Sequence, residues 1–169
     1  ELSKITLDKN WNQMQNNTQN KKNIKQKLNW YILIGLGAIM AVLNIDFTIV
    51  NLALPDIGKE YNSSLSMLQW ILNIYPIMFA STVIISGKMG DKYSPKIVFL
   101  VGVLLFFIGS VIAGVANGTP MILIGRVFQG LGMSAIFPMI YIIIEHSFGA
   151  KEKGLVVGTI ILFSGVGQS

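Results

Sequence analysis

The chain has 169 residues, of which 52% are hydrophobic and 12% are charged, and its formal net charge is +5. Soluble domains carry about 25% charged residues, so this composition favours a membrane protein. An isoelectric point near 9.5 could suggest nucleic acid, but the lysines flank apolar runs, as they do in membrane proteins, and we expect no nucleic-acid partner. The absence of cysteine and the single histidine exclude disulfide frameworks and clustered thiol or imidazole metal sites.

The chain begins at Glu1 rather than at a methionine and ends at Ser169 inside an apolar run. We therefore expect an N-terminal fragment of a longer protein, and its partners would include the missing C-terminal helices. Met14 is an alternative natural start.

Residues 1–28 are rich in Asn, Gln and Lys and have no sustained apolar period, so we predict a disordered cytoplasmic tail. Apolar runs long enough to cross a lipid bilayer follow at 30–54, 67–86, 97–116 and 121–144, with polar segments between them. A fifth run occupies 154–169. The sequence therefore predicts an all-α membrane protein, with a truncated N-terminal transmembrane bundle of about four and a half helices over 29–169.

Lysine is distributed unevenly between the two ends of these predicted helices. The two loops on one side contain only Lys59, whereas the other side carries nine lysines, namely Lys21, Lys22, Lys25, Lys27, Lys88, Lys92, Lys96, Lys151 and Lys153. Cytoplasmic loops are enriched in lysine and arginine. We therefore predict a multi-pass protein of the plasma membrane, and specifically a bacterial inner membrane, with its N-terminus in the cytoplasm.

Two ionisable residues, Asp46 and Arg126, lie inside predicted helices. Asp46 precedes Pro55 by nine residues and Arg126 follows Pro120 by six, which places them about 14 Å and about 9 Å below the same membrane surface. A charge near the bilayer centre costs at least about 2.5 kcal/mol, and such residues are usually functional. We therefore hypothesise a functional ion pair, with a purely structural pair as the alternative.

The first helix is polar on two sides. Asn44, Thr48 and Asn51 share one face, and Asp46 projects from nearly the opposite side. Such a helix cannot turn either face to lipid, so it is expected inside a bundle around a path. We interpret the three polar residues as interhelical hydrogen-bonding groups.

The fourth helix carries Arg126, Gly130, Met133 and Phe137 on one face. Methionine and phenylalanine suit a deformable apolar cavity wall, although they more often serve packing. The glycines of this helix and of the fifth run are interpreted as sites of close helix packing rather than as a phosphate loop.

Three segments of the chain resemble the major facilitator superfamily, and most closely its 14-helix drug:proton antiporter branch. Segment 46–55 resembles the characteristic helix-one motif of that branch, 87–96 resembles the loop motif of the superfamily, and 126–132 resembles its arginine motif. Trp70 and Tyr75 of the second helix also fit. The resemblance covers about residues 30–169 and implies a major facilitator fold, present here as a partial N-terminal bundle.

Within this family, the loop between helices two and three is a cytoplasmic gate, and the resemblance assigns that role to Gly87, Gly90, Asp91, Lys92 and Lys96. The chain departs from the pattern at Ser94, where glycine is usual, and at Pro95, where arginine is usual. The missing arginine removes one partner from the charge network of the gate.

The resemblance implies a proton-coupled secondary transporter that exports lipophilic or cationic small molecules by alternating access, in which two helix bundles rock around a central cavity. Asp46 and Arg126 would couple transport to the proton, the only ion or cofactor expected. The residues assigned to the substrate cavity are Gln129, Met133, Phe137 and Tyr75.

An importer of a sugar or other metabolite with the same fold is an alternative, because the glycine-proline bend that separates exporters from importers would lie beyond Ser169. A non-transporting membrane scaffold or receptor is a second alternative. The sequence contains no metal cluster, activated nucleophile or phosphate loop, so we do not expect an enzyme.

Overall fold

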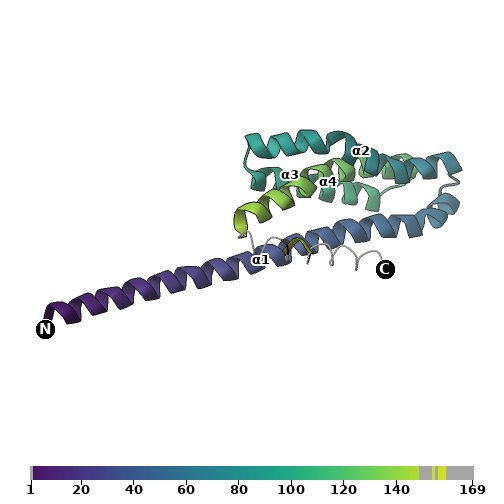
Figure 1. Cartoon of the computed structure of the whole chain (residues 1–169). Coiled ribbons are helices and arrows are strands. Elements are labelled where there is room, and N and C mark those ends of the chain that lie inside the picture. The colour runs from purple at the N-terminus through teal and green to yellow at the C-terminus, as the bar shows by residue number, and fades with distance from the viewer. Residues whose placement is uncertain (1, 149–153, 155, 159–169) are drawn as a thin grey trace.

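Four long helices follow one another in the part of the chain that the structure describes. The computed structural model describes residues 2–148, 154 and 156–158. Its helices are α1 (Leu2–Glu60), α2 (Leu65–Lys92), α3 (Pro95–Gly114) and α4 (Thr119–Ser147). In Figure 1, α2, α3 and α4 lie side by side, and α1 runs along one side of them and extends beyond the bundle to the N-terminus. The all-α fold class predicted from the sequence is confirmed for the described residues.

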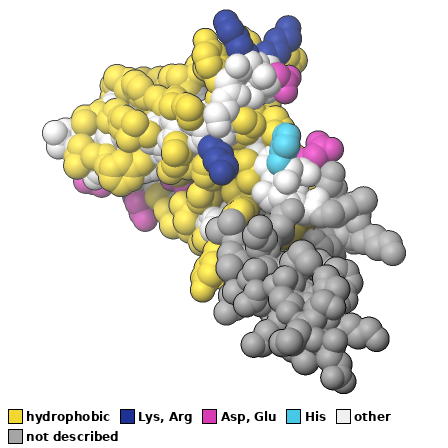
Figure 2. All heavy atoms as spheres, turned by 90° about the vertical axis from the view of Figure 1, so that its left-hand side faces the viewer, with side chains coloured by type: hydrophobic (Ala, Val, Ile, Leu, Met, Phe, Trp, Pro, Cys, Tyr) yellow, Lys and Arg dark blue, Asp and Glu magenta, His cyan; other side chains and the backbone are white. Residues whose placement is uncertain are grey.

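All four helices contain a segment that is long and apolar enough to cross a membrane. These segments are Trp30–Glu60, Leu65–Lys92, Pro95–Gly114 and Thr119–Ser147. Many large apolar side chains on them are exposed, among them Leu52, Ile84 and Leu104. Figure 2 shows the same surface end-on: hydrophobic side chains cover the flanks, and lysine, histidine and acidic side chains gather at this end. This distribution suits helices surrounded by lipid.

Helices α1, α2 and α4 are longer than the predicted runs, whereas α3 has the predicted length of 20 residues and begins two residues earlier. The first continues through Pro55 to Glu60, and Pro76 and Pro138 likewise lie inside α2 and α4. Helices that cross membranes tolerate such prolines because neighbouring groups satisfy the freed backbone. The second helix begins after Ser64, whose side chain accepts a hydrogen bond from the Met67 amide at 3.3 Å, and it runs on to Lys92.

The first 28 residues also differ from the prediction. The sequence predicts a disordered tail, whereas α1 begins at Leu2 and is one helix of 59 residues. The chain contains neither glycine nor proline before Gly35, and its lysines and glutamines are good helix formers. Nothing in this segment therefore interrupts the helix. Of the predicted fifth run, the structure describes only 154 and 156–158, which are helical; the remainder lies outside the described residues.

The fourth helix is the centre of the bundle and packs most extensively against α3 and α2. Glycines allow α3 and α4 to approach closely at two levels, Gly102 against Gly132 and Gly109 against Gly125. A Cβ atom added to Gly109 would lie 2.6 Å from the carbonyl oxygen of Gly125, and one added to Gly125 would lie 2.7 Å from that of Gly109. Gly130 meets α2 in the same way. Close packing through small residues, as predicted from the sequence, is how helices associate in lipid.

The first helix is attached to the bundle less extensively. Its buried face carries Leu33, Leu36, Met40 and Leu43, which belong to one core cluster with Ile136, Ile140 and Ile144 of α4. The turn after α1 is tied to the start of α4 by the Tyr61 hydroxyl, which donates to the Ala116 carbonyl at 2.9 Å, and by a contact between the Ser63 and Thr119 hydroxyls. These contacts lie on either side of the segment around Asp46.

The glycine contacts yield a prediction for stability. In the full-length protein, Gly109→Ala should lower the free energy of unfolding by about 1–3 kcal/mol, because the new methyl group meets backbone atoms that cannot move aside. Gly114→Ala in the same helix is the matched control, since no atom lies within 4 Å of the added group, and it should leave stability unchanged or slightly raised. Thermal unfolding in detergent measures both. Equal unfolding temperatures for the two variants would contradict the packing described.

Candidate functional site

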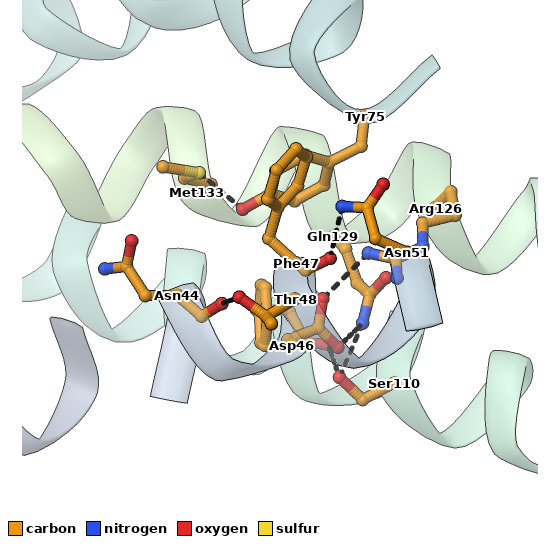
Figure 3. Close-up of polar contacts among 11 residues, drawn as sticks. Asn44, Asp46, Phe47, Thr48, Asn51, Tyr75, Ser110, Arg126, Gln129 and Met133 are labelled. Atoms are coloured by element: carbon orange, nitrogen blue, oxygen red, sulfur yellow. Dashed lines mark hydrogen bonds and ion pairs between the residues drawn. The ribbon is translucent and has the colours of Figure 1, made fainter. Parts of the chain in front are cut away.

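The carboxylate of Asp46 is bonded from α4 through both of its oxygens. Arg126 Nη1 lies 2.8 Å from Asp46 Oδ2, and Gln129 Nε2 donates to Asp46 Oδ1, also at 2.8 Å. Figure 3 shows these side chains converging between the two helices. The structure thus brings together the two charges whose matched depths suggested an ion pair. Arg126 and Gln129 lie three residues apart, so α4 turns both toward α1.

The third helix joins this site through Ser110. Gln129 Nε2 donates to Ser110 Oγ at 2.9 Å, and Ser110 Oγ in turn donates to the Phe106 carbonyl at 3.0 Å. Sequence reasoning missed this residue. A signal was available, because Ser110 is the only side chain with a hydroxyl, amide or charge in the run 97–116.

The second helix covers Arg126 with an aromatic ring. The guanidinium carbon lies 5.6 Å from the centroid of the Tyr75 ring, within the range of a cation–π interaction. The ring of Phe47, next to Asp46 in α1, lies 6.1 Å from that of Tyr75. The Tyr75 hydroxyl donates to the sulfur of Met133 (Figure 3). All four helices therefore contribute a side chain to the surroundings of the ion pair.

The polar groups of this site are deeply buried. Arg126 and Gln129 are 2% and 1% exposed, whereas the Asp46 side chain is 20% exposed. Arg126 Nε, Arg126 Nη2 and Gln129 Oε1 have no hydrogen-bond partner within the described part of the chain. Removing one member of a buried ion pair leaves an uncompensated charge, which is strongly destabilising. The ion pair therefore contributes to holding α1 against α4 while both side chains are charged.

The residues assigned to a substrate cavity fall into two groups. Gln129 faces Asp46 and Ser110 inside the polar cluster. Tyr75, Met133 and Phe137 lie between α2 and α4, where Phe137 packs edge-on against Phe79 at 5.6 Å and against Tyr141 at 5.3 Å. These three form an aromatic and thioether surface that begins at the ion pair.

The predicted gating loop is mostly helix. Gly87, Gly90, Asp91 and Lys92 occupy the last two turns of α2, and Lys96 lies in the first turn of α3. Gly90 is buried against Met139 of α4, whereas Asp91, Lys92 and Lys96 are exposed where α2 ends and α3 begins. The structure thus brings the five residues to one end of the molecule, far along α2 from Tyr75.

The polar stripe of α1 bonds within its own helix. Asn44 Nδ2 donates to the Met40 carbonyl at 2.8 Å, and Thr48 Oγ1 donates to the Asn44 carbonyl at 3.1 Å. Asn51 repeats the pattern, donating to the carbonyl of the residue four positions earlier at 2.9 Å. The three contacts lie within α1, and the bonds to other helices that the sequence predicts stay a prediction.

Comparison with known proteins gives consistent matches. A riboflavin transporter of Clostridioides difficile is 31% identical over 145 residues, which is 86% of this chain and 31% of that protein. A tetracenomycin C resistance and export protein of Streptomyces glaucescens is 31% identical over 81% of the chain and 25% of its own length. A puromycin resistance protein of Streptomyces alboniger is 27% identical over 83% of the chain and 28% of its own length.

The chain thus spans only a quarter to a third of the length of these relatives. Residues 34–169 match the sequence model of one family, and this match includes Asp46, Arg126 and the end of α2. With its four membrane-length helices, the chain belongs to the Major Facilitator Superfamily of multi-pass membrane transporters.

Proposed function

We propose that this chain is part of a proton-coupled secondary transporter that exports lipophilic or cationic small molecules by alternating access. The observation that carries the proposal is the ion pair between Asp46 and Arg126, at 2.8 Å, inside a bundle of membrane-length helices. Ionisable residues inside the membrane commonly mark proton relays and substrate paths. Asp46 would be the group of this site that takes up and releases the proton, because arginine stays protonated.

Proton uptake at Asp46 would be linked to the position of α1. While α1 is docked, Arg126 Nη1 lies 2.8 Å from Asp46 Oδ2 and compensates its charge. If α1 moves away from α4, an ionised carboxylate would remain in apolar surroundings without a counterion, which is costly. The neutral, protonated carboxyl group is then favoured. The less extensive packing of α1 supports such a movement.

The substrate would contact the surface made by Tyr75, Met133 and Phe137, with Gln129 at its polar end. Aromatic rings and a thioether give a large apolar contact that adapts to different shapes. The names of two relatives, a puromycin resistance protein and a tetracenomycin C resistance and export protein, support export as the direction of transport. The riboflavin transporter among the relatives supports a second candidate, the transport of a flavin-like metabolite.

The lysine-bearing end of the bundle would face the cytoplasm of a bacterial cell, and the N-terminus would lie on the same side. Gly87, Gly90, Asp91, Lys92 and Lys96 would close this face in one state of the transport cycle. In the sequence, Pro95 replaces the arginine usual in this motif; in the structure it occupies the first turn of α3, where proline is favoured.

Replacing the proposed proton carrier tests the mechanism. In proteoliposomes of the full-length protein, Asp46→Asn should reduce transport driven by a pH gradient to the level of empty vesicles, because the amide cannot bind and release the proton. Ethidium and riboflavin serve as probes of the two substrate candidates. Asp56→Asn, an exposed residue of the same helix, should keep wild-type rates. Proton-driven flux that survives in Asp46→Asn would refute the assignment.

A double-variant cycle separates a functional ion pair from a structural one. Arg126→Leu should destabilise the full-length protein by about 3–5 kcal/mol, because Asp46 is left as a buried, unpaired charge. The double variant Asp46→Asn with Arg126→Leu should recover most of that stability but no proton-driven transport. Thermal unfolding and vesicle flux are measured on the same preparations. A double variant that transports at the wild-type rate would leave the pair with a structural role alone.

The orientation can be tested by labelling because this chain contains no cysteine. In a full-length protein without other cysteines, Lys59→Cys should react in intact cells with a membrane-impermeant maleimide. Lys92→Cys should react only after the cells are opened, because the positively charged end is expected inside. Both positions are exposed, so burial does not account for a difference. The reverse pattern would invert the proposed topology.

A further inference from the structure

The amide of Gln129 has a fixed orientation at the ion pair. Its nitrogen bridges Asp46 Oδ1 at 2.8 Å and Ser110 Oγ at 2.9 Å, while its oxygen has no hydrogen-bond partner among the residues that the structure describes. The side chain is 1% exposed. A buried amide oxygen without a partner is costly, so it calls for an explanation.

This orientation matches the ionised form of Asp46. Both carboxylate oxygens accept, one from Arg126 Nη1 and the other from Gln129 Nε2. Ser110 fits the same state, because its hydroxyl hydrogen is directed to the Phe106 carbonyl and a lone pair remains to accept from Gln129. Both N–H groups of the Gln129 amide are therefore hydrogen-bonded, whereas its oxygen has no partner among the described residues (Figure 3).

A proton on Asp46 would reverse the hydrogen bonding at one of its oxygens. Arginine has donors but no acceptor, so an O–H group at Oδ2 would face another donor. The proton is therefore accommodated at Oδ1, opposite Gln129. With the amide oriented as it is, that O–H group would also meet an N–H group. Rotation of the amide by about 180° exchanges its nitrogen and oxygen and presents Oε1 as the acceptor.

The side chains around Asp46 differ in whether they can rearrange their hydrogen bonds when Asp46 carries a proton. Arg126 faces it from α4 and keeps its charge; the Tyr75 hydroxyl, from α2, is engaged with Met133 Sδ. From α3 comes Ser110, whose hydroxyl does not titrate and can turn from the Phe106 carbonyl to donate to the rotated amide oxygen. The rotated amide oxygen can therefore accept from the protonated Asp46 and from Ser110, and the amide N–H groups turn to the place where Oε1 has no partner among the described residues.

We propose that Gln129 is a positioning residue whose amide reverses when Asp46 takes up a proton, with Ser110 turning alongside it. The site then binds both forms of Asp46 while α1 remains docked, so protonation can precede the movement of α1. The step adds one proton at Asp46 Oδ1 and breaks no covalent bond. This inference rests on the proposed function, in which Asp46 binds the coupling proton.

Infrared difference spectroscopy of the full-length protein across a pH step tests the proposal. In the wild type, the band of the protonated carboxyl group should appear together with a change in a glutamine side-chain amide band, identified by ¹³C labelling of glutamine. Gln129→Met, a variant of similar length without an amide, should lose the amide change and shift the carboxyl band. Proton-driven transport by this variant should fall about tenfold or more, as expected for a buried hydrogen-bonding mismatch.

Two further variants make the result decisive. Ser110→Ala keeps the amide of Gln129 but removes its hydroxyl partner, so the glutamine amide band should remain and shift in frequency. This frequency can be measured even if Gln129→Met fails to fold. Ser86→Ala, which breaks a hydroxyl pair with Ser134 at 3.1 Å between α2 and α4, is the matched control and should leave both bands unchanged. A carboxyl change without any glutamine change, or an amide band unaltered in Ser110→Ala, would overturn the proposal.

The Asp46→Asn variant separates failure of this inference from failure of the proposed function. If it removes the carboxyl band, Asp46 is the proton-binding group, whatever Gln129 does. If the carboxyl band persists, the coupling proton binds elsewhere and the proposed function fails first.

Discussion

The structure depends on one electrostatic constraint: a carboxylate and a guanidinium lie inside a bundle of membrane-length helices and must compensate each other. Asp46 Oδ2 and Arg126 Nη1 lie 2.8 Å apart, with the arginine almost fully buried. Neither charge would be tolerated there alone, since lipid offers no hydrogen bonds and little screening. The ion pair therefore links α1 to α4 at this depth.

Glycine packing makes this constraint possible. Because Gly109 has no side chain, α4 can approach α3 very closely. A Cβ atom added to Gly109 would lie 2.8 Å from the backbone nitrogen of Gln129 and 2.9 Å from its Cγ. Gln129 therefore lies directly over the turn of α3 that carries Ser110, within hydrogen-bond distance of it. Close backbone contact, which stabilises helices in lipid, also sets the geometry around the carboxylate.

Helix α1 is attached to the bundle on both sides of Asp46. Apolar contacts hold it on one side of Asp46 and hydrogen bonds hold the turn after it on the other, while the charged cluster holds the segment between them. The segment around Asp46 is thus held to α4 by charged and hydrogen-bonding groups, and α4 is packed closely against α3 through Gly109 and Gly125.

The sequence by itself determined the number of described membrane helices and the matched depth of Asp46 and Arg126, because apolar length and helical rise are local properties. It did not determine where the helices end, since α1 passes through Pro55 and α2 includes most of the supposed loop. Only the tertiary structure decided that Gln129 bonds to Asp46 and that Ser110 joins them. Such contacts depend on how closely α3 and α4 approach and on their relative rotation, which no pattern within one helix records.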